Sequence, residues 1–204
     1  MAVKQGARFL WGSESLKDKT VAVQGLGAVG FPLAEDFLAD GARLVVCDRD
    51  PEAVRKLVAA SPEGAVRVVE PEAILGVEAD IFAPAAVGGI LDEHNIPDLK
   101  FRMIMGPANN VLKASSQEEE YALAARIAER GILYQVEWVH NIAGVMAGYE
   151  EYVHQERASR ERLMENVGKL CTEQTWENLN GARREGVTPT EHAYRSVERE
   201  VYGE

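Results

Sequence analysis

The sequence predicts an α/β fold: a doubly wound, mostly parallel sheet of about six strands, followed by a helical C-terminal segment. Short apolar runs alternate with amphipathic helical segments up to about residue 145. Within each run, consecutive residues are apolar rather than every second one, which indicates strands that are covered on both faces. A parallel sheet with helices on both sides buries strands in this way.

Turn residues and helix signals divide this alternation into elements. Pro51 stands where a proline best opens a helix, and Gly12 and Gly41 stand where helices should end. Ser115 and Glu118 form a capping-box pattern ahead of a further helix. The predicted strands span residues 20–25, 43–48, 65–69, 80–86, 101–106 and 132–139, and the predicted helices span residues 2–11, 29–40, 51–60, 71–75 and 121–131.

The strand pattern stops after residue 144. Residues 146–184 are predicted to be mostly helical, with a polar middle, HQERASRER, that should stay solvated. Thr188 and Glu191 form a second capping box, with Pro189 at the first helical position. A last helix should therefore run to near Tyr202.

Composition and charge exclude several classes of function. The chain has 204 residues, 46% of them apolar and 27% charged, and its net charge is −11. Such an acidic surface repels nucleic acid and anionic membranes, and no apolar run approaches the ~18 residues of a membrane span. Two cysteines make no disulfide framework, and the first residues lack the apolar core of a signal peptide. We therefore expect a cytoplasmic protein with neither nucleic acid nor a membrane as a partner.

The most informative motif is the segment VAVQGLGAVG, where Gly25, Gly27 and Gly30 follow a predicted strand and open a predicted helix. The first glycine permits a tight turn, the second lets a pyrophosphate approach the backbone, and the third lets the helix pack closely on the strand. The helix N-terminus offers free N–H groups to phosphates. Ala28 and Val29 complete the expected phosphate-binding segment. The motif predicts a Rossmann-like dinucleotide-binding domain.

Asp48 ends the second predicted strand, about 20 residues beyond the first glycine, where a carboxylate binds the adenosine ribose hydroxyls. A 2′-phosphate there would meet like charge, so the motif favours NAD over NADP, although the neighbouring Arg49 weakens this preference. The alternative interpretation is a glycine-rich strand–helix turn with a solvated aspartate.

Three later stretches, APAAVGG, GPANN and HNIAGV, fall at or beyond predicted strand ends, where open α/β sheets bind ligands. Their small residues admit a flat ring close to the backbone. Asn109, Asn110 and Asn141 carry amides that can pair with a carboxamide or a ribose hydroxyl. Each asparagine by itself fits a turn or a helix cap better. Their convergence on one sheet edge favours a binding role.

These segments, in this order, resemble the cofactor-binding half of the glutamate/leucine/phenylalanine/valine dehydrogenase family, in particular its leucine and valine branch. The similar segments are SLKDKTVAVQGLGAVG, DIFAPAAVGGILDEHNIPDLK, GPANN, RGILYQVEWVHNIAGV and EGVTPTEHAY. The resemblance extends over nearly the whole chain. The resemblance implies an oxidoreductase that reversibly deaminates an amino acid, with hydride passing to NAD. It places Gly25, Gly27, Gly30 and Asp48 at the pyrophosphate and ribose, and Ala86, Asn109 and Asn141 near the nicotinamide.

Two residues depart from the family pattern. Pro107 stands where the family usually has serine, and it lacks the N–H that a serine would offer. Ile142 replaces an alanine of the family segment, and we expect it to add bulk near the nicotinamide ribose. Both changes concern the nicotinamide end of the cofactor more than its adenosine end.

The glycine motif comes early, because only nineteen residues precede Thr20. The resemblance implies a separate N-terminal substrate domain, and the first nineteen residues resemble the helix that joins the two domains. We therefore expect the substrate domain to be absent. The whole chain, 1–204, is then one NAD-binding domain made of a linker helix (1–19), a nucleotide-binding core (20–145) and C-terminal helices (146–204).

Deamination needs a general base, and we expect this chain to supply no catalytic residue. Four residues near predicted sheet edges are candidate bases: Lys113, His94, His140 and Glu137. For Lys113, a solvated surface lysine is a more ordinary interpretation than a general base. Cys47 is expected to be a small buried strand residue, and no metal-ligand spacing is present. Two functions stay open. The chain is either the cofactor domain of an amino-acid dehydrogenase, as a piece of a longer chain or as one chain of a split enzyme with a separate substrate-domain chain, or a stand-alone NAD(H)-binding sensor. The intact glycine motif argues against a third interpretation, a structural remnant that binds nothing.

Loss of a covering domain should expose apolar surface, so a homodimer is also expected. The candidate surfaces are the end of the first helix and an apolar stripe along the C-terminal helical region. Their residues are Phe9, Leu10 and Trp11, then Tyr149, Tyr152, Val153, Leu163, Met164, Val167, Leu170 and Cys171.

Overall fold

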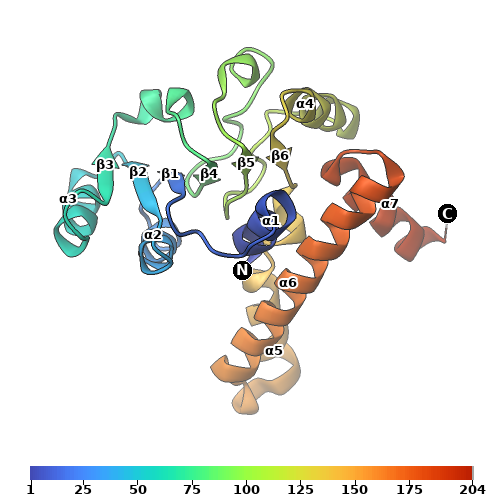
Figure 1. Ribbon diagram of the computed structural model, residues 1–204. Helices are drawn as coiled ribbons and strands as arrows, with labels where there is room; N and C mark the ends of the chain where they lie inside the picture. The colour runs from blue at the N-terminus through green and yellow to red at the C-terminus, as the bar shows by residue number, and fades with distance from the viewer. Residues whose placement is uncertain (204) are drawn as a thin grey trace.

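Six strands form a single sheet in the computed structural model, which describes residues 1–203 (Figure 1). The strand order is β3-β2-β1-β4-β5-β6, and every adjacent pair of these strands is parallel. The strands are β1 (Thr20–Gln24), β2 (Arg43–Cys47), β3 (Val66–Val68), β4 (Ile81–Pro84), β5 (Met103–Ile104) and β6 (Leu133–Tyr134). The predicted fold class is confirmed.

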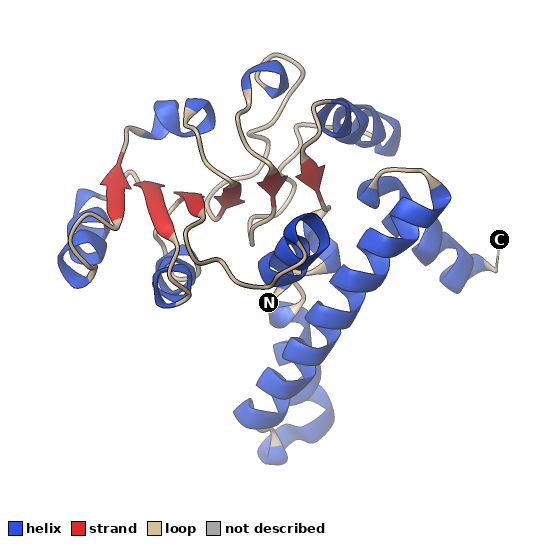
Figure 2. Ribbon diagram, viewed as in Figure 1, coloured by secondary structure: helices blue, strands red, loops and turns tan. Residues whose placement is uncertain are grey.

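Helices cover both faces of the sheet (Figure 2). One face packs against α1 (Ala2–Trp11), α2 (Gly30–Ala39) and α3 (Pro51–Ala60). The other face packs against α4 (Gln117–Glu129) and two 3₁₀ helices, η1 (Pro71–Gly76) and η2 (Ile96–Asp98).

Successive residues of β1 supply two different cores. Val21 and Val23 face the α1–α3 layer, whereas Ala22 faces the α4 layer, and all three are fully buried. On the α4 side, Phe82 of β4 stacks on Phe101 with ring centroids 4.9 Å apart. Each large apolar side chain buried in this way contributes about 1.5–3 kcal/mol. Burial on both faces explains why the strands are apolar at consecutive positions.

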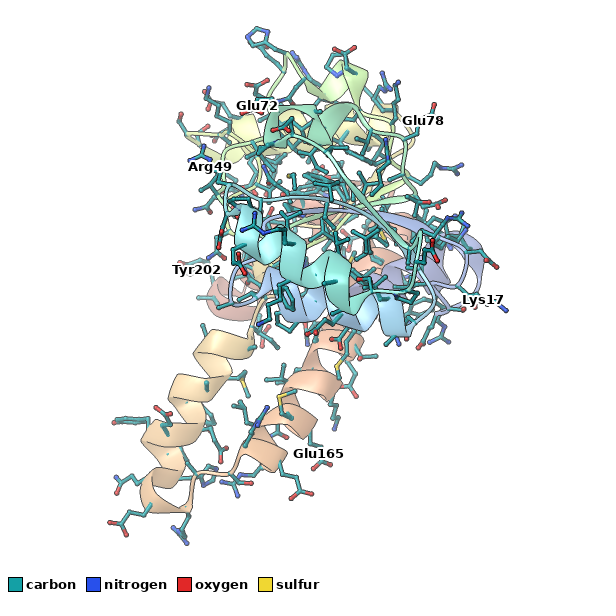
Figure 3. All side chains as sticks on the ribbon, turned by 90° about the vertical axis from the view of Figure 1, so that its left-hand side faces the viewer. Lys17, Arg49, Glu72, Glu78, Glu165 and Tyr202 are labelled. Atoms are coloured by element: carbon teal, nitrogen blue, oxygen red, sulfur yellow. The ribbon has the colours of Figure 1, made fainter. Side chains whose placement is uncertain are left out.

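Three helices follow the sheet in the C-terminal part of the chain. They are α5 (Ala143–His154), α6 (Arg160–Glu185) and α7 (Pro189–Tyr202), with the short helix η4 (Gln155–Arg157) between the first two. Helix α6 packs on α1, and α7 packs on both α6 and α4. The α5–α6 hairpin projects from the body of the molecule, with Glu165 on its α6 arm (Figures 1 and 3). None of the helices between residues 1 and 203 is long and apolar enough to cross a membrane.

The segment predicted to be mostly helical is broken in its polar middle. Gln155 has a positive φ of 47°, and Ser159 caps α6 by accepting a hydrogen bond from the Arg162 N–H at 3.3 Å. The Glu150 carboxylate accepts a hydrogen bond from the Ser159 N–H at 2.8 Å and forms an ion pair with Arg162. These contacts fix the reversal between the two arms of the hairpin.

The expected strand 132–139 is wrong in its second half. Only Leu133–Tyr134 pairs as a strand, and the 3₁₀ helix η3 (Glu137–Val139) follows. The physical reason is the shortness of its only partner, β5, which stops before Gly106 and Pro107 although a strand to residue 106 was expected. A proline has no N–H for a ladder, so β6 has nothing to pair with beyond the end of β5.

The capping box ahead of α4 lies one residue later than predicted. Ser116, not Ser115, is the N-cap residue, and its hydroxyl accepts a hydrogen bond from the Glu119 N–H at 3.3 Å. The Glu119 carboxylate accepts a hydrogen bond from the Ser115 N–H at 2.7 Å. The two serines are adjacent and chemically identical, so only the three-dimensional path of the chain separates them. The second capping box, at Thr188, is confirmed by a 3.1 Å hydrogen bond from the Glu191 N–H.

Candidate cofactor-binding site

The glycine loop lies between β1 and α2, at the point where the strand order reverses. Strand β1 has β2 on one side and β4 on the other, and the chain leaves it first toward one edge of the sheet and later toward the other. Open α/β sheets bind ligands at this switch point, outside the carboxyl ends of the strands. The predicted motif is therefore placed where a dinucleotide would bind.

The three glycines have three different environments. Gly25 has a φ of +95°, and an added Cβ would lie 2.8 Å from the Ala86 Cβ. An added Cβ at Gly30 would lie 2.0 Å from the Gly25 carbonyl oxygen and 3.0 Å from the Ala85 Cβ. At Gly27, by contrast, nothing lies within 4 Å of an added Cβ. Gly25 and Gly30 are thus needed by the fold, and Gly27 leaves open space above the loop.

The loop also presents unused hydrogen-bond donors. Within the described part of the chain, no partner is present for the backbone N–H groups of Gly27, Ala28, Val29 and Gly30. They lie where α2 begins, at the positive end of its dipole. Unpaired N–H groups beside open space suit the oxygens of a pyrophosphate.

Asp48 holds the glycine loop as well as ending the β2 segment. Its carboxylate accepts hydrogen bonds from the N–H of Leu26, at 2.5 Å, and from the N–H of Asp50, at 2.7 Å. Each carboxylate oxygen keeps a second lone pair for a further donor. Its neighbour Arg49 is exposed and points outward from the loop after β2 (Figure 3).

The loops after β4 and β5 are joined to each other by backbone hydrogen bonds. The Gly89 N–H donates to the Asn110 carbonyl at 2.6 Å, and the Lys113 N–H donates to the Leu91 carbonyl at 2.8 Å. Gly88 approaches this second loop so closely that an added Cβ would lie 2.2 Å from the Asn109 carbonyl oxygen. The two loops therefore behave as one surface beside the glycine loop.

Two predicted asparagines meet at this surface. The Asn141 amide donates a hydrogen bond to the side-chain oxygen of Asn109. Ala86 is exposed in the loop after β4, close to Gly25. Asn110 plays a different part, because its φ of +51° marks it as a turn residue, the alternative weighed for each asparagine.

A cavity of about 440 Å³ opens beside these loops. It is bordered by residues of α1 and α2 and by the segments that carry Pro107 and Asn141. His140 also lines it, and its Nε2 lies 3.0 Å from the Gly106 carbonyl oxygen. Burial lowers the pKa of His140 to about 4, so this imidazole is neutral at physiological pH.

Glu137 supports the Asn109–Asn110 turn from within the core. Its carboxylate accepts hydrogen bonds from the Tyr134 hydroxyl at 2.7 Å and from the Val111 N–H at 3.2 Å. Burial raises the pKa of this carboxyl above its ordinary value. The sequence suggested Glu137 only as a candidate base, since a glutamate in a strand-like run does not reveal its partners.

The two departures from the family pattern lie in different places. Pro107 borders the 440 Å³ cavity. Ile142 instead lines another cavity, between η3, α6 and α7, together with Trp138 and His192. Its added bulk therefore concerns the packing of α5 on the C-terminal helices.

The other candidate residues follow the ordinary interpretations. Lys113 is exposed, and Cys47 is 1% exposed, with its thiol pKa raised by burial to about 11. No group of His, Cys, Asp and Glu within residues 1–203 is arranged to hold a metal ion.

The strand order, the glycine loop at the switch point and its free N–H groups define a dinucleotide-binding domain of the Rossmann class. Residues 20–82 match the family model described as the NAD binding domain of 6-phosphogluconate dehydrogenase. The chain is 34% identical to a phenylalanine dehydrogenase of Lysinibacillus sphaericus, over 100% of this chain and 51% of that protein. It is 38% identical to a leucine dehydrogenase of Geobacillus stearothermophilus, over 82% of this chain and 44% of that protein.

A solved structure, L-tryptophan dehydrogenase from Nostoc punctiforme, superposes with a TM-score of 0.88 at 31% identity, covering 99% of this chain and 58% of that one. The chain is therefore an NAD-binding domain that is similar to one half of the leucine, phenylalanine and valine dehydrogenases. It spans about half the length of the curated relatives it matches.

Substitutions at two glycines should separate folding from binding. We expect Gly30→Ala to lower the free energy of unfolding by about 1–3 kcal/mol, because the new methyl group has no room. Gly27→Ala should leave stability unchanged and weaken NAD binding about tenfold, because the methyl group would occupy the space above the loop. Thermal unfolding and calorimetric titration measure the two effects. A Gly27→Ala variant that binds NAD as tightly as the original chain would contradict the assigned role.

Proposed function

We propose that this chain is the cofactor-binding half of an enzyme that oxidatively deaminates a branched-chain or similar amino acid. The observation that carries the proposal is the alignment, along one sheet edge, of unpaired loop N–H groups, the Asp48 carboxylate and the Asn109–Asn141 pair. Similarity to amino-acid dehydrogenases over the full chain supports the same conclusion.

The proposed roles follow the edge from β2 to β6. Asp48 and Arg49 would meet the adenosine ribose, and the N–H groups of 27–30 would bind the pyrophosphate. Ala86 would lie near the nicotinamide ring, and Asn109 and Asn141 would bind the nicotinamide ribose or carboxamide. NAD supplies the hydride acceptor when bound. The chain's own residues bind and orient it.

The groups that activate an amino acid would come from a separate segment or chain that carries the substrate domain. The candidate bases of this chain have other surroundings. Lys113 is exposed to solvent, and the His140 Nε2 is hydrogen-bonded to the Gly106 carbonyl. Glu137 is occupied by Tyr134 and Val111. We propose that the nucleotide-binding core (20–145), with its linker helix (1–19) and C-terminal helices (146–204), is one cofactor domain that a substrate domain completes.

The chain should bind NAD(H) more tightly than NADP(H). A 2′-phosphate beside Asp48 would meet a carboxylate, whereas the free ribose hydroxyls can donate to it. Asp48→Ala should weaken NAD binding by about 1–2 kcal/mol and reduce the difference in affinity between NAD and NADP. Asp50→Ala is the matched control, since it removes an acidic N-cap of α3 two residues away. Calorimetric titration decides, and equal affinities for NAD and NADP in the unmodified chain would refute the preference.

The chain alone should not deaminate leucine, valine or phenylalanine at a useful rate. The reason is that the lysines that bind and activate the amino acid, by the family resemblance, belong to a substrate domain and have no match among the described residues. An assay of NADH absorbance with each amino acid measures the rate. Turnover near ~1–10 s⁻¹, ordinary for an enzyme, would mean that the chain contains a base after all.

We also propose that the chain forms a homodimer through α5. Val145, Tyr149, Tyr152 and Val153 recur at helical spacing and are 78%, 57%, 83% and 44% exposed. Exposed apolar stripes of this kind mark interaction surfaces. The other predicted surface is less available. Phe9 and Trp11 are half-buried, beneath Arg183 and Lys19 respectively.

Tyr152→Glu should convert the dimer to a monomer, because it places a charge in the middle of this stripe. Tyr202→Glu is the matched control, since Tyr202 is 73% exposed but lies at the end of α7. Light scattering after size exclusion, at several concentrations, reports the mass. A monomeric mass for the unmodified chain at every concentration would rule out the dimer.

A further inference from the structure

A chain of buried amide and imidazole groups connects the C-terminal helices to the loop after β5. Gln135, which is fully buried just after β6, stands at its centre. The Gln135 Nε2 lies 3.3 Å from the His140 Nδ1 and 3.3 Å from the Thr175 hydroxyl on α6. The Asn178 Nδ2, also on α6, lies 3.3 Å from the Gln135 Oε1.

The network continues to α7 through Asn178. The Asn178 Nδ2 also donates to the Pro189 carbonyl at 3.0 Å, and its Oδ1 lies 2.8 Å from the His192 Nδ1. At the other end, the His140 Nε2 lies 3.0 Å from the Gly106 carbonyl. Five side chains and two carbonyls from four parts of the fold thus need consistent donors and acceptors. The side chains are those of Gln135, His140, Thr175, Asn178 and His192.

The two backbone carbonyls set the direction of every bond. Because the Gly106 oxygen can only accept, the His140 Nε2 carries the proton and its Nδ1 accepts from Gln135. Because the Pro189 oxygen can only accept, the amide nitrogen of Asn178 points toward it, and the Asn178 oxygen accepts from His192. Turning either amide around would place donor against donor or acceptor against acceptor.

This network ends between the two asparagines of the proposed nicotinamide site. His140 directly precedes Asn141, and the carbonyl that it engages lies three residues before Asn109. The Ala108 N–H and the Glu137 carboxylate hold other parts of the loop after β5, but Pro107 has no N–H to donate, so the His140 ring is the partner of the adjacent Gly106 carbonyl. The His140 ring therefore joins the two loops whose asparagines meet.

We propose that the Gln135–Asn178 amide pair is a positioning device through which α6 and α7 hold His140, and with it the Asn109–Asn141 pair, ready for the nicotinamide half of NAD. Gln135, Asn178 and His140 act through these loops and are positioning residues. With a pKa lowered by burial to about 4, His140 is neutral at physiological pH, and the Gly106 carbonyl selects the tautomer that is protonated at Nε2. The inference rests on the proposed NAD site.

The test compares NADH with ADP-ribose, which lacks the nicotinamide. Gln135→Leu should weaken NADH binding about five- to tenfold and leave ADP-ribose binding within about twofold, because only the nicotinamide loops lose their support. Gln5→Leu is the matched control. Gln5 is also a buried glutamine, 3% exposed, but it lies on α1 outside this network. It should leave both affinities unchanged.

Calorimetric titration of both ligands separates the outcomes. Equal losses for NADH and ADP-ribose, or no loss for either, would overturn the positioning role while leaving the NAD site intact. Failure of the unmodified chain to bind either ligand would overturn the proposed site and the inference with it.

A measurement on the unmodified chain keeps the inference testable if Gln135→Leu does not fold. Nitrogen-15 NMR of the assigned His140 ring should show a single tautomer protonated at Nε2, unchanged from pH 6 to pH 8. A ring protonated at Nδ1, or a mixture of the two tautomers, would contradict the network.

Discussion

The close approach of α2 to the loop after β4 is the constraint on which the rest of the structure depends. Gly30 begins α2 against Ala85 of this loop and against the Gly25 carbonyl, and neither glycine has room for a side chain. This contact places the first turn of α2 directly over the end of β1. The N–H groups of residues 27–30 then make no hydrogen bond in a strand ladder or a helix, and they remain available at the sheet edge. The packing constraint and the binding surface are therefore two consequences of one backbone path.

The sheet forms a separate hydrophobic core on each of its two faces. The α1–α3 layer packs on one face and the α4 layer on the other, and each strand contributes alternate residues to both. Helices α6 and α7 bridge the layers, because α6 contacts α1 and α7 contacts α4. Their buried polar groups reach back to His140, so the C-terminal helices are in contact with the site loops as well as with the core.

Much of the site could be predicted because it depends on local sequence. A glycine motif after a strand, an acidic residue at the end of the next strand and small residues after later strands are all visible along the chain. The strand ends were harder to predict, as β5 and β6 show. Their length depends on how far each neighbour continues, and Pro107 in one loop limits pairing in the other. Which of two adjacent serines caps α4 could not be predicted either, since Ser115 and Ser116 have the same side chain.

The sequence by itself determined the alternation of strands and helices, the placement of Gly25, Gly27 and Gly30 at a turn, and the acidic end of β2. These features follow from steric and periodic properties of single residues and short runs. Only the tertiary structure decided that Asn109 and Asn141 meet, that Asn110 serves the turn, that Ile142 faces the C-terminal helices and that Gln135 reaches both His140 and Asn178. The physical reason is that contacts such as Asn109–Asn141 and Gln135–Asn178, 32 and 43 positions apart, depend on where the packed sheet brings their segments, which no local pattern encodes.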